Sequence, residues 1–288
     1  MPHSNRKKRN ATPAQKRFQV TDDDGWTHVT SGSNVRRVVR TTTRNDREQY
    51  IRTDEEEPVL SPAEAPARLT FGDLEAQYRG YKEKWVQSET WQRLKGQLDQ
   101  RIRDQEAETN EGSRDIDVNA MPIGFIDQIV CIGLGSPSGF LRDGWVDRRA
   151  VSMYQLAALD TIRNTLTNSN RSLPLSFPVY AQDPVFNALD RALLESLGMT
   201  VVESPVAFER VTSKTLLFCP GAERKHLDIL LPSNPQLVLG GPLEDTESSI
   251  IQTYAEKTES RVLVPFSAQE HAFWKMRLYI MPQFEGGS

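Results

Sequence analysis

Glycines and serines crowd the segment that follows a short apolar run, in residues 130–139, which read VCIGLGSPSG. They are Gly133, Gly135, Ser136, Ser138 and Gly139. Backbone amides in such a turn can hold an anion, because glycine lets the chain approach closely and a nearby helix start adds a favourable dipole. The first interpretation is therefore a turn that binds the phosphate of a nucleotide.

The spacing of the glycines supports a second interpretation, a close-packed turn without a ligand. The pattern G-x-G-x-x-x-G is one residue longer than the dinucleotide fingerprint, and Pro137 removes one amide donor. The helical pattern resumes only near Arg148. Both interpretations stay open on the sequence, and we favour the turn without a ligand.

Asp183 ends the next apolar run, within the sequence QDP. Because proline is favoured in the first turn of a helix, we expect Asp183 to be the N-cap of a helix that runs to Leu197. An acid after the second strand is also where nucleotide and methyl-donor sites hold a ribose. We favour the cap and keep binding of a nucleotide or S-adenosylmethionine as the alternative. Glu203 is a weaker candidate of the same kind.

Cys219 and Pro220 end a later run and form a dipeptide through which some proteins bind haem iron by a thiolate. A buried cysteine before a strand-ending proline is the competing interpretation, and we favour it. His226 follows on the next helical pattern, where we expect a polar surface residue. The sequence has no P-loop, nucleophile elbow or metal-spaced cluster, so we expect no metal site and favour binding over catalysis.

Alternating strand and helix patterns surround these motifs. The expected strands are Gln128 to Gly133, Pro178 to Ala181, Met199 to Glu203, Thr215 to Cys219, Leu237 to Gly240 and Arg261 to Val264. The expected helices are Arg148 to Thr165, Pro184 to Leu197, Ala222 to Leu231 and Glu244 to Lys257. Apolar strands separated by helices predict an α/β fold, a Rossmann-like, doubly wound domain with a mainly parallel sheet. In such a sheet, ligands bind beyond the carboxyl ends of the strands, near the reversal of strand order.

Three regions divide the chain. Residues 1–68 are rich in charged residues, Ser, Thr and Pro, so we expect a disordered tail with basic and acidic runs. Its run Arg6 to Arg9 could act as a nuclear-import signal or as an RNA-contacting tail. The competing interpretation is a solvated basic tail, and we favour this one. Residues 69–115 carry an aromatic stripe at helical spacing, with a phase shift between Trp85 and Trp91. The stripe predicts an amphipathic helical segment, one long helix that packs on its own domain rather than on a partner. Residues 116–288 form the predicted α/β domain.

Charge and composition narrow the class of protein. The 288 residues carry a net charge of −4, so we expect no nucleic-acid partner for the core. No apolar stretch reaches the length of a membrane span, and the start lacks a signal-peptide core. Cys131 and Cys219 lie in apolar runs and argue against a disulfide framework. We expect a cytoplasmic or nuclear protein with protein partners and no membrane contact.

Five segments together resemble the SRR1-like family, named for a plant protein of red-light and circadian signalling. They are CIGLGSPSG (131–139), SMYQLAALD (152–160), VYAQDPVFNALDRALLESLGMTVVE (179–203), FCPG (218–221) and LVLGG (237–241). The resemblance covers about residues 125–266. It implies a regulatory protein, linked in different lineages to circadian timing, microtubule stability and haem biosynthesis, with no settled catalytic activity. The sequence departs from the family pattern where Phe218, Ala222 and Gly241 stand at usually polar strand-end positions.

Overall fold

The computed structural model describes residues 17–21, 27–31, 61–111, 126–140, 147–169, 177–244 and 246–282. The predictions for Arg6 to Arg9 and for the domain boundary after residue 115 lie outside these residues. The chain divides into two units, Met1–Pro58 and Val59–Ser288. In the first unit, β1 (Arg17–Thr21) pairs antiparallel with β2 (Thr27–Ser31), a hairpin that the expectation of a disordered tail did not include.

A seven-stranded sheet organises the second unit, in the order β5-β4-β3-β6-β7-β9-β8. Its strands are β3 (Gln128–Ile132), β4 (Val179–Gln182), β5 (Thr200–Val201), β6 (Thr215–Cys219), β7 (Leu237–Gly240), β8 (Glu259–Val262) and β9 (Arg277–Ile280). Strands β3 to β7 are parallel, and only β9 runs antiparallel to its neighbours β7 and β8. The structure therefore confirms the mainly parallel α/β sheet and adds β9, which was not predicted.

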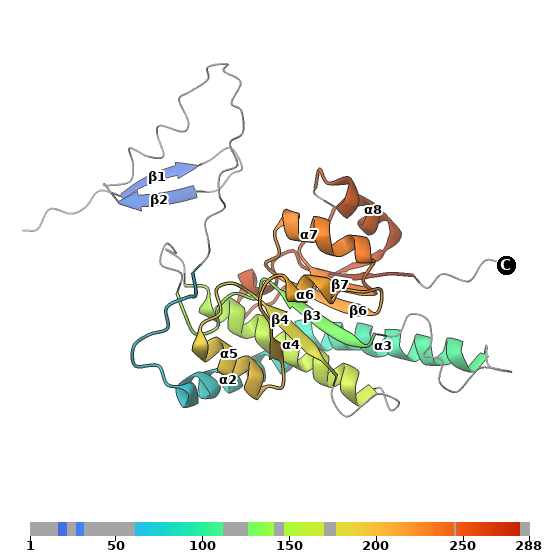
Figure 1. Ribbon diagram of the computed structural model, residues 1–288, viewed down its shortest axis with the longest axis horizontal. Helices are drawn as coiled ribbons and strands as arrows, with labels where there is room; N and C mark the ends of the chain where they lie inside the picture. Colours follow the sequence, from blue (N-terminus) through green and yellow to red (C-terminus); the bar gives the residue numbers. More distant parts are fainter. Residues whose placement is uncertain are drawn as a thin grey trace, which may run out of the picture. The chain divides into compact units, whose positions relative to one another are not determined.

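Helices cover both faces of this sheet (Figure 1). They are α2 (Phe71–Val86), α3 (Glu89–Glu111), α4 (Arg149–Ser169), α5 (Ala188–Ser196), α6 (Val206–Glu209), α7 (Arg224–Leu230) and α8 (Ser249–Lys257). Alternate residues of β3 enter different apolar clusters: Ile129 and Cys131 pack with α2 to α5, and Val130 and Ile132 pack with α6 to α8. This two-sided burial explains why the parallel strands are apolar throughout.

The aromatic stripe before the sheet forms two helices that belong to the core. Thr70 caps α2 through a capping box with Asp73, since each side chain accepts the other's backbone amide. The helix ends at Val86 and α3 begins at Glu89, which corrects the prediction of one long helix, and the break lies at the phase shift of the stripe. Trp85 is fully buried and its Nε1 donates to Thr161 Oγ1 of α4 at 2.9 Å. The structure confirms that these helices pack on their own domain.

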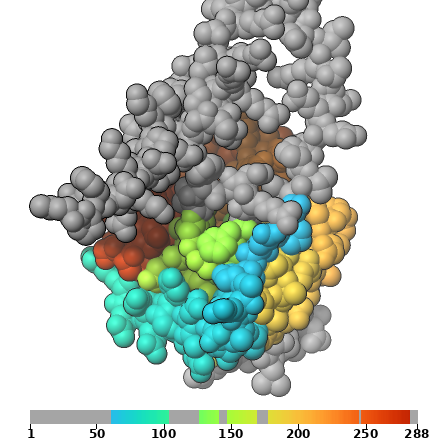
Figure 2. Space-filling model, turned by 90° about the vertical axis from the view of Figure 1, so that its left-hand side faces the viewer, coloured from blue at the N-terminus to red at the C-terminus, as the bar shows by residue number. Residues whose placement is uncertain are grey.

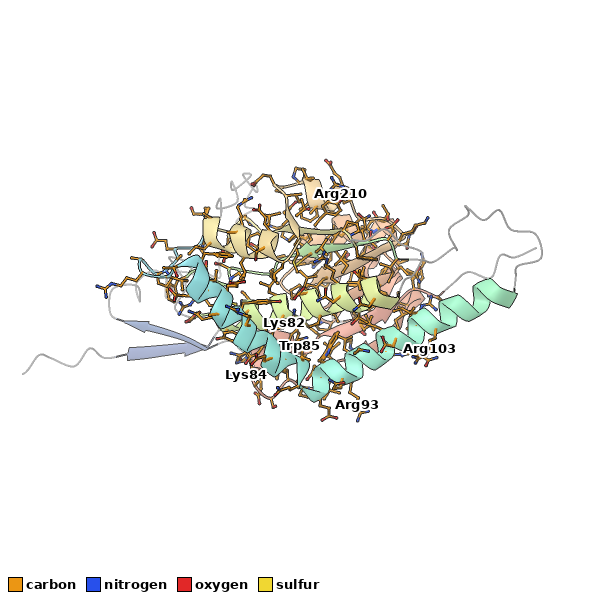
Figure 3. All side chains as sticks on the ribbon, turned by 90° about the horizontal axis from the view of Figure 1, so that it is seen from below. Lys82, Lys84, Trp85, Arg93, Arg103 and Arg210 are labelled. Atoms are coloured by element: carbon orange, nitrogen blue, oxygen red, sulfur yellow. The ribbon has the colours of Figure 1, made fainter. Side chains whose placement is uncertain are left out.

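A buried charge also joins α2 to α4. Lys82 Nζ and Tyr78 Oη each lie 2.6 Å from Asp160 Oδ2. Figure 3 shows Lys82 and Trp85 on α2, which lies alongside α4. No helix in the described ranges is long and apolar enough to cross a membrane.

Candidate functional site

The order of the sheet reverses between β3 and β6, because β4 and β5 follow on one side and β6 and β7 on the other. Ligands of open parallel sheets bind beyond the carboxyl ends of the strands at this kind of reversal. Gly133 follows β3 here, Asp183 follows β4, and Pro220 follows β6. The structure thus brings the predicted motifs to one edge of the sheet.

Two glycine turns meet backbone to backbone at the reversal. Gly133 has a φ of +75°, and a Cβ on it would lie 2.6 Å from the carbonyl carbon of Gly221. A Cβ on Gly221 would lie 2.5 Å from the Gly133 oxygen. Both positions therefore need glycine, and their contact links the β3 turn to the β6–α7 turn.

The amides of the glycine turn bind the protein's own carboxylates. Gly135 N donates to Asp183 Oδ2 at 2.7 Å, and Ser138 N donates to Asp190 Oδ1 at 2.9 Å. Gly139 N donates to Ser136 Oγ, which itself donates to Asp190 Oδ2 at 2.6 Å. A phosphate at these amides would have to displace one carboxylate and lie beside the other.

The helix after β4 begins later than expected, which corrects the cap assigned to Asp183. Its N-cap is Asn187, whose side chain accepts from Leu189 N and Asp190 N. Asp190, at the third position of the helix, completes a capping box, because its carboxylate accepts from Asn187 N at 3.1 Å. Asp183 instead accepts from Val185 N at 3.1 Å and from Gly135 N, so it holds two turns together.

The chain before α2 lies across the outer end of the glycine turn. Ala63 N donates to Val185 O, and Glu64 and Phe140 exchange two backbone hydrogen bonds of 2.9 Å. Asn187 Nδ2 donates to Ala63 O at 3.0 Å, and Ala63 is buried. Figure 2 shows the segment after residue 60 in blue against the green and yellow parts of the chain. The sequence analysis predicted that the folded part begins at residue 69. In the structure it begins earlier, because Ala63 and Glu64 already pack on the glycine turn.

Asp183 is partly buried, and burial raises the pKa of its carboxyl above the ordinary value of 3.8. The nearby charge of Asp190 raises this pKa further, and the two amide hydrogen bonds from Gly135 and Val185 lower it and offset part of the effect. His226 Nδ1 accepts from Glu223 N at 3.3 Å, and its ring lies 5.6 Å from that of Phe208. The edge of the sheet therefore presents a carboxylate, an imidazole and an aromatic ring.

Because burial raises the pKa of Asp183, we expect the folded chain to bind a proton there more tightly than the unfolded chain. Its contribution to stability is then greatest at acidic pH and is lost as the pH rises through the raised pKa. In Asp183→Asn this pH dependence disappears, and the unfolding free energy at pH 7 stays within about 1 kcal/mol of the wild type, because relief of charge burial offsets one lost hydrogen bond. Urea titrations between pH 3 and 7 measure both effects. Parallel pH profiles for the two proteins would contradict the assignment.

Cys219 ends β6 with its side chain buried against Gly240, on which a Cβ would lie 2.7 Å from Sγ. Burial raises the pKa of the Cys219 thiol to about 12, so the thiol is protonated at neutral pH. Cys131 belongs to the apolar cluster on the opposite face of the sheet. Across the part of the chain that the structure describes, no three His, Cys, Asp or Glu side chains are grouped to hold a metal.

The sequence profile of the SRR1 domain matches residues 117–280, more than half of the chain. The chain belongs to the SRR1 domain family. A search of curated proteins finds no match. The matched part of this SRR1 domain contains the whole sheet from β3 to β9, and it begins after α2 and α3, which pack on the same core.

Sequence reasoning missed the residues that fix the glycine turn of the SRR1 domain. Asp190 is fully buried and accepts from two residues of that turn, and Asn187 connects the turn to Ala63. One signal was present in the sequence, because Asn187 and Asp190 have the spacing of a capping box. Nothing local points to Ala63.

Proposed function

We propose that this SRR1 domain is a regulatory module that binds an adenosine-type ligand without a phosphate, of the S-adenosylmethionine class. The site is the carboxyl edge of β3, β4 and β6. The single observation that carries the proposal is the place of Asp183, whose carboxylate lies at the end of β4 beside the strand-order reversal and the turn of Gly133 and Gly135. This is where ribose-binding carboxylates of doubly wound domains lie.

Hydrogen-bond capacity supports a ribose at Asp183. An ionised carboxylate has about four lone-pair sites. Each oxygen of Asp183 accepts one backbone amide, from Gly135 or from Val185, and among the residues that the structure describes no donor occupies the second direction on either oxygen. Two vicinal hydroxyls of a ribose can donate to these directions, because the side chain is only partly buried.

Charge supports a ligand without phosphate. The glycine turn already holds the carboxylates of Asp183 and Asp190, which would repel a phosphate group. A neutral nucleoside or a cationic sulfonium meets no such repulsion. This argument favours S-adenosylmethionine over the nucleotide cofactors considered on the sequence.

Methyl transfer is a second candidate function, which the strand order favours. Counted from β3, the order is 3-2-1-4-5-7-6, with the seventh strand antiparallel. Rossmann-like methyltransferases share this order, but likeness of fold alone does not assign an activity. The test is whether the full chain, supplied with methyl-labelled S-adenosylmethionine and cell extract, forms S-adenosylhomocysteine faster than extract alone.

Haem binding at Cys219 has weaker support than ligand binding at Asp183. A thiolate ligand must lose its proton and reach the iron, whereas the Cys219 thiol is buried and protonated at neutral pH. Links to circadian timing and the cytoskeleton stay implications of the family resemblance. Protein partners and a cytoplasmic or nuclear location stay predictions from the sequence.

Calorimetric titration of the full chain tests the proposed ligand. We expect S-adenosylmethionine and adenosine to bind, and ATP and NAD to bind no more tightly than adenosine. Asp183→Asn removes charge-assisted hydrogen bonds of about 1.5–3 kcal/mol, so affinity falls by about tenfold or more. Glu203→Gln is the matched control, because Glu203 is exposed and pairs with Arg191, and we expect unchanged affinity.

Two results would overturn the proposal. Tightest binding of ATP or NAD with no effect of Asp183→Asn would favour a phosphate site in the glycine turn. If none of the adenosine compounds binds, the proposal that this edge of the sheet binds an adenosine-type ligand is wrong.

A further inference from the structure

A cavity lies at the carboxyl ends of β6 and β7, between the turns that lead to α7 and α8. Figure 1 shows the two helices that follow these turns, α7 and α8. Its volume is about 420 Å³. The lining residues are Cys219, Pro220, Ala222, Arg224, Leu227, Gly241, Pro242, Leu243, Thr246, Glu247 and Ile251. The cavity has the size of small-molecule sites, which occupy about 300–1,000 Å³, and shares only the β6–α7 turn with the Asp183 site.

The lining divides into an apolar part and a charged part. Leu227, Leu243 and Ile251 supply aliphatic surface, and Leu243 and Ile251 are fully buried. Arg224 and Glu247 supply the charges, and Arg224 Nη1 lies 3.7 Å from Glu247 Oε2. A few polar groups beside an apolar wall are typical of sites for small organic molecules.

The missing side chain of Gly241 keeps this cavity open. A Cβ built on Gly241 meets no atom within 4 Å, although Gly241 lines the cavity. The neighbouring Gly240 is different, because a Cβ there would lie 2.7 Å from Cys219 Sγ. Close packing therefore requires glycine at position 240, while glycine at 241 leaves free volume next to the strand ends.

The charged part favours an anionic group on the ligand. The Glu247 side chain is 93% exposed, so water screens its attraction for a cation, and it can leave Arg224 at small cost. Arg224 is half-exposed and has a planar guanidinium, which can hold a carboxylate or sulfonate by two parallel hydrogen bonds. An anion can thus replace Glu247 at Arg224.

We propose that this cavity binds a small molecule with an apolar ring or chain and one anionic group. The apolar part lies on Leu227, Leu243 and Ile251, and the anion pairs with Arg224. The proposal does not depend on the identity of the ligand at Asp183.

Fluorescence titration of the full chain with 8-anilinonaphthalene-1-sulfonate tests this site, because the probe joins aromatic rings to one sulfonate. We expect saturable binding to the wild type. In Gly241→Leu the new side chain fills the cavity without strain, so affinity falls at least tenfold. In Arg224→Gln the anion loses its partner, and affinity falls several-fold.

Gly96→Leu is the matched control, because Gly96 is an exposed glycine of α3 whose Cβ would also meet nothing within 4 Å. We expect wild-type affinity for the probe in this variant. Circular dichroism and the melting temperature verify that each variant is folded. Titration of Gly241→Leu with S-adenosylmethionine separates loss of this cavity from loss of the Asp183 site. Absence of saturable binding to the wild type, or equal affinity in Gly241→Leu, would overturn the proposal.

Discussion

Gly133→Ala is expected to lower the free energy of unfolding by about 3 kcal/mol or more, through backbone strain and overpacking together. The φ of +75° is one that alanine rarely adopts, and the new Cβ would lie 2.6 Å from the carbonyl carbon of Gly221. The neighbour is backbone, so it cannot rotate away as a flexible side chain would. Urea denaturation at neutral pH measures the effect.

Gly221→Ala is expected to lower the free energy of unfolding by a similar amount, because its Cβ would lie against the Gly133 oxygen. Gly241→Ala is the control, and we expect a change within about 0.5 kcal/mol because its Cβ has free space. Wild-type stability in Gly133→Ala would show that the two turns do not pack as the structure has them.

Trp85→Ala is expected to cost about 3–5 kcal/mol, the usual range for truncating a buried large aromatic residue. The centroid of the Trp85 ring lies 4.7 Å from that of Phe273, 5.5 Å from that of Phe266 and 5.8 Å from that of Trp91. The ring therefore joins α2 and α3 to the segment between β8 and β9. Thermal or urea denaturation of the full chain measures the loss.

The control is Trp274→Ala, because this ring is 61% exposed and its removal should change stability by no more than about 0.5 kcal/mol. A stable Trp85→Ala variant would mean that α2 and α3 are dispensable for the fold. The partner-binding interpretation of the aromatic stripe would then be open again.

Hydrophobic periodicity predicted most of the fold because it is a local signal. β6 and β7 were predicted at their observed bounds. The prediction of one long helix over the aromatic stripe was wrong, because the chain breaks between α2 and α3 at the phase shift of the stripe. β9 was missed because RLYI is short and follows a long irregular segment. The start of α5 was misplaced because the Asp183-Pro184 pair and the Asn187 capping box are competing local signals, and only the folded chain shows which one operates.

The candidate site was predictable only in part, because sequence patterns report local structure and most contacts of the site join distant residues. Gly133, Gly135 and Asp183 could be placed at one edge because the carboxyl ends of parallel strands share an edge. The partner of each amide could not be predicted, because the donor and acceptor are far apart in sequence. Asp183 and Gly135 are 48 residues apart, and Asn187 and Ala63 are 124 apart. Such contacts follow from the fold and leave no local pattern.

The most direct test of the central claim is a nuclear magnetic resonance titration of the full chain with S-adenosylmethionine, observed at the backbone amides. The amides of Gly135 and Val185 donate to Asp183, so their resonances report a ligand on that carboxylate. We predict that both resonances shift in proportion to the bound fraction and that Asp183→Asn moves the midpoint of the titration to a ligand concentration at least tenfold higher. Unchanged resonances of Gly135 and Val185 at saturating ligand would contradict the account.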